Sequence, residues 1–433
     1  MQAVSSWGRL RQVPHEVDRP AFLDSAREAT QRGGPMLGYG LGRSYGDVCL
    51  NENGRLIVTH LLDRFIAFDR ESGVVRAEAG LSLDRLLRVI VPAGWFVPVV
   101  PGTKFVTLGG AVANDVHGKN HEGAGTFGAH VRAIGLARSS GETLTLSPSE
   151  NAELFAATIG GLGLTGMILW VELQLAPIRC AKLQTETLAM SDLDAFFRLA
   201  QESRDWPYTV AWVDCLAKGS ATGRGLFIRA RHAEGGELKV HGAPRLGVPL
   251  DAPGFLLNSA TIAAFNTLWR KRPWVLGAST QHYEPFFFPL DAIANWNKLY
   301  GKRGFYQHQS VVPTAAAPDT LRRLLGLTAE FGEGSFLMVL KLFGDKPSPG
   351  LLSFPMPGAT LALDFPNKGE STQRLLDRMA GTVLAAGGRL YPAKDATMSG
   401  EAFRAGYPAW RELEARRDPA FMSDFWRRVT EAA

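Results

Sequence analysis

The chain has few cysteines and no arrangement of them that indicates a metal site or disulfides. Cys49, Cys180 and Cys215 are the only cysteines among 433 residues. Their scattered positions match neither a zinc-ligand spacing nor a disulfide framework. A secreted disulfide scaffold is therefore excluded, and a reducing compartment is the default expectation.

Long apolar runs are also missing. No stretch approaches the roughly 20 apolar residues of a membrane span, and residues 1–20 lack the apolar core of a signal peptide. We therefore expect a protein that is cytoplasmic or peripherally associated with a membrane.

The charge balance is close to even, with 47 Lys and Arg against 42 Asp and Glu, a net charge of +5. These charges are spread along the chain, so we expect no nucleic-acid partner, whereas mild basicity suits anionic substrates or membrane surfaces. The length predicts two or three domains.

Glycine is abundant, and it gathers in two stretches, residues 35–51 and 100–121. The first stretch places glycine between bulky or polar residues at Gly38, Gly40, Gly42 and Gly46. In the second, short polar side chains and a histidine accompany Gly102, Gly109, Gly110 and Gly118. Glycine permits positive φ and close approach of the backbone to a ligand, and bare amides bind phosphate. Together the stretches predict a cradle for a large, flat or phosphorylated ligand.

The remaining pattern divides the chain into three segments. Residues 1–180 alternate short strands and helices, including a strand expected at 95–100. Residues 181–387 pair aromatic strands with longer helices, one expected at 290–300 and one after a capping box of Ser191 and Asp194. Residues 388–433 are expected to be helical and basic, and to pack back on the first segment.

Two familiar motifs compete for the first stretch. Residues 42–46 fit the G-x-S-x-G elbow of serine hydrolases, with Ser44 as the nucleophile. Residues 38–42 have the glycine content of a Rossmann loop. Both motifs need a helix directly afterwards, and the Rossmann loop also needs a following parallel strand. We expect neither feature, so both interpretations are disfavoured.

Eight motifs in order resemble another family: GLGRSYGD, PGTKFVTLGGAVANDVHGKNH, TFGAHVR, AELFAATIGGLGLTG, KLFG, LSFPMPG, DFP and GGRLYPAKD. They are similar to the vanillyl-alcohol-oxidase-type flavoproteins, and within these to the bacterial polyprenylphosphoryl-ribose oxidases. The resemblance implies an α+β, two-domain PCMH-type FAD-binding fold. Residues 1–180 would form the FAD-binding domain, completed by residues 388–433. Residues 181–387 would form an inserted substrate domain, an antiparallel sheet flanked by helices.

The resemblance also implies which residues contact FAD. They are Gly38, Gly40, Leu41, Gly42, Arg43, Ser44, Tyr45, Gly46, Asp47, Gly102, Thr107, Leu108, Gly109, Gly110, Asn114, Asp115, Val116, His117, Ile168 and Tyr391. Relatives that bond FAD covalently have a histidine at the position of Arg43. A guanidinium cannot form that link, so we expect a non-covalent flavin.

For catalysis the resemblance implies Lys394 as the essential active-site lysine, with Tyr45 and His117 lining the reactive face. The substrate site would contain Lys119, Trp212, Gln307, Gln309, Phe336, Lys341, Ala362 and Lys394. Gln307 and Gln309 alternate along one expected strand and would share a face. At Ala362, mycobacterial relatives have a cysteine. His117 and His121 lack a third ligand, so no metal is expected.

The implied reaction oxidises the 2-hydroxyl of a polyprenylphosphoryl-β-D-ribose to the keto sugar, the first half of an epimerisation. A separate NAD(P)H-dependent short-chain reductase would be the partner that completes it. The aromatic and basic stretch 255–288 would suit a peripheral membrane contact or domain packing. The alternative from the same class is an FAD-dependent oxidase of another sugar, alditol or aldonolactone.

Overall fold

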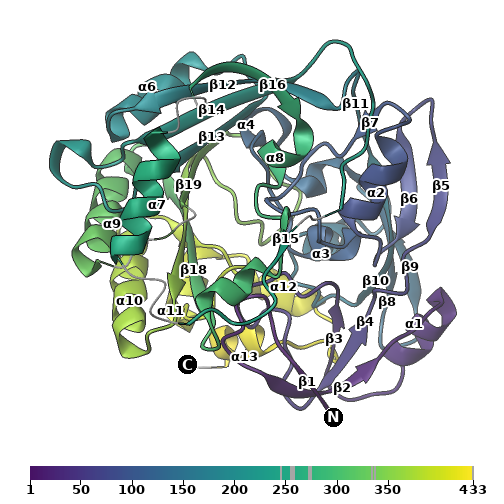
Figure 1. Cartoon of the computed structure of the whole chain (residues 1–433). Coiled ribbons are helices and arrows are strands. Elements are labelled where there is room, and N and C mark those ends of the chain that lie inside the picture. Colours follow the sequence, from purple (N-terminus) through teal and green to yellow (C-terminus); the bar gives the residue numbers. More distant parts are fainter. Residues whose placement is uncertain (244–245, 254–258, 272–275, 333–334, 336–337, 432–433) are drawn as a thin grey trace.

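One large antiparallel sheet faces a group of smaller sheets across the middle of the molecule (Figure 1). The computed structural model describes residues 1–243, 246–253, 259–271, 276–332, 335 and 338–431. The mixture of helices and largely antiparallel sheets is the α+β class that the sequence predicts.

The N-terminal segment contains two main sheets. The four-stranded sheet has the order β1 (Gln2–Val4), β2 (Val13–Asp18), β4 (Arg55–Val58) and β3 (Met36–Tyr39). The five-stranded sheet has the order β5 (Phe65–Asp69), β6 (Val74–Glu78), β10 (Met167–Gln174), β8 (Val131–Ala137) and β9 (Thr143–Leu146). A small sheet pairs β7 (Trp95–Phe96) with β11 (Ala176–Pro177).

Short helices cover these sheets. They are α1 (Leu23–Thr30), α2 (Leu83–Ile90), α3 (Leu108–Ala113), α4 (His121–Ala124), the 3₁₀ turn η1 (Phe127–His130) and α5 (Ala152–Thr158). Helix α2 begins at Ser82, whose hydroxyl caps the Arg85 amide. Its residues Leu83, Leu86, Leu87 and Ile90 are fully buried at helical spacing. They join the core under the five-stranded sheet.

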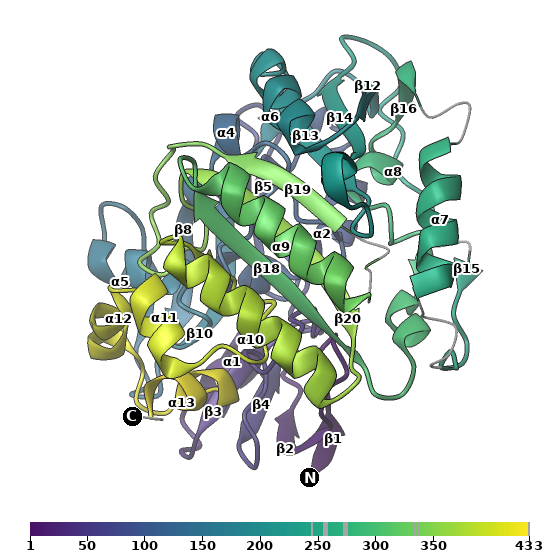
Figure 2. The same ribbon diagram turned by 90° about the vertical axis from the view of Figure 1, so that its left-hand side faces the viewer.

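The large sheet has eight strands. Their order is β16 (Gly277–His282), β12 (Lys182–Met190), β14 (Gly225–His232), β13 (Tyr208–Val213), β19 (Met338–Phe343), β20 (Gly358–Pro366), β18 (Phe305–Pro313) and β21 (Arg389–Leu390). Figure 2 shows α9 (Ala317–Phe331) and α10 (Glu370–Ala385) lying along one face of this sheet, with α6 (Leu193–Glu202) beside its β12–β14 end. Leu361, Leu363 and Phe365 belong to the buried core cluster that also contains residues of these helices.

Smaller elements flank the large sheet. They are the 3₁₀ turn η2 (Gly219–Ala221), β15 (Leu246–Gly247), α7 (Ser259–Lys271), α8 (Tyr283–Phe287), β17 (Ile293–Ala294) and the 3₁₀ turn η4 (Trp296–Tyr300). In Figure 2, α7 and β15 stand at the edge of the molecule, away from α10. Among the described helices, none combines the length and apolarity that crossing a bilayer requires.

A buried ion-pair network joins the N-terminal and middle segments. Lys104 is fully buried, pairs with Glu284 and lies 3.5 Å from Asp84. His241 Nε2 bonds the same Asp84 carboxylate at 2.7 Å, and its Nδ1 contacts the Tyr283 hydroxyl at 2.5 Å. Because a buried charge is costly without a partner, this network fixes α8 and the 241 region against α2.

The C-terminal segment contacts both other segments. It begins with β21, which pairs with β18, and continues as α11 (Gly400–Gly406), α12 (Trp410–Arg416) and α13 (Asp424–Thr430). The Met36 amide donates to the Ala420 carbonyl, and the Met422 amide to the Met36 carbonyl. These contacts support the proposal that the tail completes the N-terminal domain. The expectation of a helical tail holds for α11, α12 and α13, whereas the first residues of the tail extend the large sheet as β21.

Three local predictions were wrong. The strand expected at 95–100 ends at Phe96, because Pro98 and Pro101 have no amide proton for a ladder. The helix expected at 290–300 does not form: Ile293–Ala294 are β17, Asn295 has a φ of 56°, and only the 3₁₀ turn η4 follows. Helix α6 is capped by Asp192, which accepts from the Ala195 amide, and not by Ser191.

Candidate active site

The first glycine stretch is a loop between two parallel strands. It leaves β3 after Tyr39 and enters β4 at Arg55, and these two strands pair in parallel. The expectation that no parallel strand follows was therefore wrong. The connection nevertheless contains turns and no helix, so it is neither a Rossmann crossover nor a nucleophile elbow. Ser44 is consequently not placed as a hydrolase nucleophile.

This loop presents bare backbone amides. Within the described part of the chain, the amides of Leu41, Gly42, Arg43 and Ser44 donate no hydrogen bond. Consecutive free amides in a loop form a concave binding site for anions such as a pyrophosphate. The loop therefore fits the diphosphate of FAD without any charged side chain.

Close packing explains why glycine is needed here. A Cβ on Gly46 would lie 1.6 Å from the Asp395 carbonyl oxygen. On Gly40 it would lie 2.5 Å from Thr107 Oγ1, and Gly42 has a φ of 60°. Side chains at these positions would push the loop away from its neighbours. By contrast, Gly102 faces open space within 4 Å.

The second glycine stretch contains helix α3 rather than an open loop. Thr107 caps it by accepting from the Gly110 amide, and the Leu108 and Gly109 amides bond to Leu81 and Ala79. The amides of Gly109 and Gly110 are thus used internally. What this stretch offers is polar side chains: the Asn114 Oδ1 atom is buried without a partner, and the Tyr391 hydroxyl donates to the Asn114 carbonyl.

The other predicted flavin contacts line the same region. Ile168 lies beside Gly109, and Val116, Ile168 and Tyr391 are buried. Gly38 lies against the Met167 sulfur. The orphaned Asn114 oxygen and the free amides of the first loop are groups that bound FAD would satisfy, so the residues present fit this cofactor.

Two predicted contacts have side chains engaged elsewhere. The Asp115 carboxylate accepts from the Gly128 amide and from the hydroxyls of Ser348 and Ser353. Burial raises its pKa, against these hydrogen bonds. The Asp47 carboxylate forms a bidentate pair with Arg428, at 2.8 and 2.9 Å. Any flavin contact of these residues is therefore a backbone contact.

Arg43 is held by local contacts. Its Nη1 atom donates to the Leu41 carbonyl at 2.8 Å, and its guanidinium lies 4.1 Å from the centre of the Trp7 ring. Burial lowers its pKa, while nearby Asp291 opposes this effect. The cation is thus stacked and oriented beside the first loop.

The large sheet presents its polar side chains on the side opposite α9 and α10, here called the site face. Strand register places residues from four strands in rows on this face. One row contains Trp212, Val339, Ala362 and Gln309, a second contains Lys341, Thr360 and Val311, and a third contains Asp364 and Gln307. The predicted substrate residues Trp212, Gln307, Gln309, Lys341 and Ala362 are therefore brought together. Phe336 lies outside the described residues.

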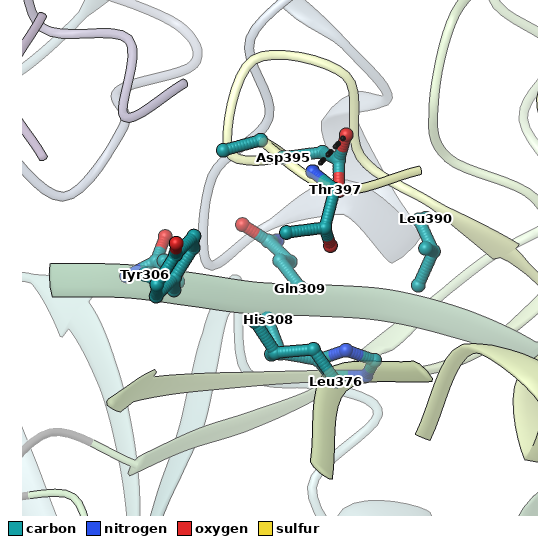
Figure 3. A pocket seen from close by; sticks show the side chains of 9 residues that line it. Tyr306, His308, Gln309, Leu376, Leu390, Asp395 and Thr397 are labelled. Carbon is teal, nitrogen blue, oxygen red and sulfur yellow. Dashed lines mark hydrogen bonds between the residues drawn. The ribbon is translucent and has the colours of Figure 1, made fainter. Parts of the chain in front are cut away.

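Figure 3 shows the alternation on β18 directly. Gln309 points toward the turn that contains Asp395 and Thr397, whereas His308 points to the other side of the strand. A cavity of about 10 Å³ lies here, lined by residues that include Gln307, Gln309 and Asp395. That volume is about what one water molecule needs, so this cavity is not a substrate site.

His117 faces Gln309 across the site. The Gln309 amide donates to His117 Nε2 at 2.9 Å, so the neutral ring has its proton on Nδ1. This Nδ1 is buried without a partner. Burial, together with nearby Lys341, lowers the pKa of His117 well below its ordinary value. His117 is therefore a neutral hydrogen-bond donor here rather than a charged acid.

Three partly buried lysines converge on the same face. Lys394 Nζ lies 3.8 Å from the centre of the Tyr45 ring. Lys341 Nζ donates to the Gly118 carbonyl at 3.4 Å, and Lys119 Nζ donates to the Phe286 carbonyl at 2.5 Å. Burial lowers the pKa of Lys341 to about 8, and burial with nearby Lys341 lowers that of Lys119 to about 7. Among the described residues, none of these lysines has an ion pair within 4.0 Å.

The sequence prediction missed Asp364. It is fully buried, lies opposite Gln307 in the sheet and accepts from Gln307 Nε2 at 2.5 Å. Its second oxygen, Oδ2, has no partner among the described residues. The motif DFP contains this residue, but the face on which it lies follows only from its pairing with Gln307 in the structure.

Comparisons with known proteins agree with this geometry. A protein-family model described as an FAD binding domain matches residues 21–147. The chain is 35% identical to decaprenylphosphoryl-beta-D-ribose oxidase of Mycolicibacterium smegmatis, over 98% of this chain and 96% of that protein. It is also 35% identical to an uncharacterized protein in the mprA 5' region of Streptomyces coelicolor, over 81% and 100%. L-gulonolactone oxidase of Scyliorhinus torazame is 29% identical over 44% and 45%.

Proposed function

The chain belongs to the family of FAD-dependent oxidases that includes decaprenylphosphoryl-beta-D-ribose oxidase, and from this premise we propose its reaction. It oxidises the 2-hydroxyl of a polyprenylphosphoryl-β-D-ribose to the 2-keto sugar. FAD, held by the first loop and Asn114, would be the oxidant that accepts a hydride from the sugar carbon. The protein supplies the binding, the orientation and the management of the proton.

One observation carries the choice of substrate class: the positive charge of Lys119 and Lys341, which no nearby carboxylate compensates. Cations this buried are costly without a counter-charge, and no carboxylate in the described part of the chain pairs with them within 4.0 Å. A phosphorylated sugar brings that counter-charge. Lys119 and Lys341 then hold the phosphate end, while Lys394, over Tyr45, lies beside the sugar.

The other site residues take positioning roles. His117 and Gln309 form a hydrogen-bonded pair that reaches the ring edge or the sugar. Ala362 and Trp212 share a row with Gln309 and bound the substrate space with uncharged surface. Tyr45 is a residue of the first loop, is 7% exposed, and lies with its ring beside Lys394.

The flavin is held without a covalent bond. Arg43 occupies the position at which relatives with covalent FAD have a histidine, and its guanidinium is already stacked on Trp7. A guanidinium that stays protonated is not a nucleophile for the flavin. FAD is therefore released when the protein is denatured with acid.

The proposed substrate also requires two partners. A keto sugar that becomes an arabinose needs a separate NAD(P)H-dependent short-chain reductase. A polyprenyl tail needs a lipid phase, and the edge that contains β15 and α7 presents Leu246, Leu250 and Leu268, which are 68%, 77% and 72% exposed. Exposed leucines suit insertion into a bilayer surface, so we place the peripheral membrane contact here.

The test is an anaerobic absorption experiment on the purified protein. We expect a yellow flavin that bleaches on addition of polyprenylphosphoryl ribose and that passes into the supernatant after acid precipitation. Lys394→Met retains the flavin but bleaches at least about 100-fold more slowly, whereas the exposed control Lys182→Met bleaches at the normal rate.

Two results would contradict the proposal in different ways. A flavin that bleaches only with a soluble aldonolactone or alditol would replace the substrate and keep the fold. A protein that binds no FAD would overturn the whole assignment.

A further inference from the structure

Oxidation of a hydroxyl releases a proton as well as a hydride, so the site needs a proton acceptor next to the reacting oxygen. His117 is a poor candidate, because its Nε2 already accepts a hydrogen bond from Gln309. The acceptor must be a group with an open lone pair at the site face, close to Tyr45 and Lys394.

The carboxylates around the site differ in how many hydrogen bonds and ion pairs they already form. Asp115 is bonded to two serines and an amide. Asp47 and Asp395 share Arg428. Asp291 accepts from the Lys104 amide and the Thr103 hydroxyl. Among these described carboxylates, only Asp364 has a buried oxygen without a hydrogen-bond partner within 3.5 Å, and the Tyr300 hydroxyl lies close enough to lower the pKa of this carboxyl as a donor.

We propose that Asp364 Oδ2 accepts the proton of the sugar hydroxyl, and that the Lys394 ammonium holds the oxygen of that hydroxyl beside Asp364. This inference rests on the proposed function of the site. In the step, the O–H bond breaks toward Asp364, its electron pair forms the C=O bond, and the C–H electron pair leaves as the hydride that bound FAD accepts.

The surroundings of Asp364 suit this role. Gln307 Nε2 fixes Oδ1 at 2.5 Å, and the Asp364 amide donates to Ser335 Oγ at 3.0 Å, so the free oxygen has a defined direction. Tyr45 and Tyr300 lie beside the carboxylate, and its charge raises the pKa of both phenols in addition to the effect of burial. Neither phenol therefore competes as a base.

Electrostatics place the carboxyl and the lysine in the same titration range. Burial raises the pKa of Asp364, and the Gln307 hydrogen bond and the Lys394 charge limit that rise. Burial lowers the pKa of Lys394, which the Asp364 charge opposes and the Lys341 charge reinforces. A carboxylate with a raised pKa is a stronger base than an exposed one, and the Lys394 charge limits the rise so that part of Asp364 is ionised near neutral pH.

Asp364→Asn tests the proposal, because it keeps the shape and an oxygen for the Gln307 bond. We expect bound FAD to be retained and the rate of anaerobic bleaching to fall about 10²- to 10⁴-fold. The acid limb of the pH–rate profile disappears. Asp377→Asn is the matched control, since Asp377 accepts from Gln373 as Asp364 does from Gln307, but at an exposed position.

The pH–rate profile of Asp364→Asn distinguishes this proposal from the alternative in which neutral Lys394 is the base. Removing the Asp364 charge lowers the pKa of Lys394. If neutral Lys394 were the base, Asp364→Asn would keep an acid limb, shifted to lower pH, and would retain or gain rate at neutral pH. That outcome overturns the proposal, as does a rate within about threefold of wild type with an unchanged profile.

A second measurement needs no turnover and no stable variant. Infrared difference spectra of wild-type holoenzyme, taken between acidic and neutral pH, should contain the band of a buried protonated carboxylic acid. The band is lost on ionisation and shifts when the 2-keto product binds. Its absence overturns the proposal. Wild-type protein that polyprenylphosphoryl ribose does not bleach would instead contradict the proposed substrate.

Discussion

Arg428 connects α13 to the first loop, and its loss should weaken FAD binding. Its guanidinium bonds both Asp47 oxygens, at 2.8 and 2.9 Å, and lies 3.2 Å from Asp395. Arg428→Met leaves these two carboxylates, 13% and 8% exposed, without a counter-charge. Breaking a fully buried pair costs about 3–5 kcal/mol.

The Arg428 side chain is 27% exposed, so solvent screening reduces that cost. We expect a loss of about 2–3 kcal/mol. If this whole free-energy loss appears as a cost of ordering the first loop when FAD binds, the Kd for FAD rises about 30- to 150-fold. Titration of the apoprotein with FAD, followed by flavin fluorescence, measures this change.

The control for this experiment is Arg374→Met, which removes an exposed pair with Glu370 and should cost about 0.3–0.5 kcal/mol. A double-mutant cycle with Asp47→Asn separates the pair from general damage to α13. Equal FAD affinity in Arg428→Met and Arg374→Met, or additive effects of Arg428→Met and Asp47→Asn, would refute the reasoning.

Three further predictions follow from the site and its supports. Gly46→Ala should lower the apoprotein's melting temperature and abolish FAD binding, because its Cβ would meet the Asp395 carbonyl at 1.6 Å. Gly102→Ala should leave the melting temperature unchanged and weaken only FAD affinity. Equal losses of melting temperature in the two variants would contradict this prediction. The affinity for the phosphorylated sugar should fall as pH rises through the lysine pKa values of about 7 and 8, and Lys119→Met and Lys341→Met should flatten that dependence in equilibrium titrations. Burial raises the pKa of Asp84, but hydrogen bonds from His241 and Arg88 outweigh burial and hold the pKa at about 2. This carboxylate therefore stabilises the fold above about pH 4, and its contribution to the free energy of unfolding is lost as pH falls toward 2. Acid unfolding of Asp84→Asn should lack that component, and an unchanged acid midpoint would show that the network contributes nothing.

The sequence predicted the site best where local pattern decides the outcome. Alternation along β18 put Gln307 and Gln309 on one face, and the strand register confirms this. The first glycine loop was predicted from residue types that tolerate close approach, and its free amides fit that interpretation. The family and the cofactor were also correct, because the quoted motifs are specific in their order.

The sequence failed where contacts between distant residues decide. Asp364 reads as a core residue of an apolar strand until its pairing with Gln307 is known. The second glycine stretch became a helix because Thr107 caps it and its amides find partners at Ala79 and Leu81. The network of Lys104, Asp84 and His241 spans far-apart segments, and no spacing along the chain indicates it.

The attachment of the first loop to α13 has a consequence for biosynthesis. Residues near the start of the chain, Met36, Tyr45 and Asp47, bond to Ala420, Ala393 and Arg428 near its end. A nascent chain on the ribosome therefore has the glycine loop but lacks the groups that hold it in shape. Long-range closure of this kind is slow to form. We therefore expect FAD to be captured only after α13 has been made, and a chain terminated before α13 to bind FAD weakly.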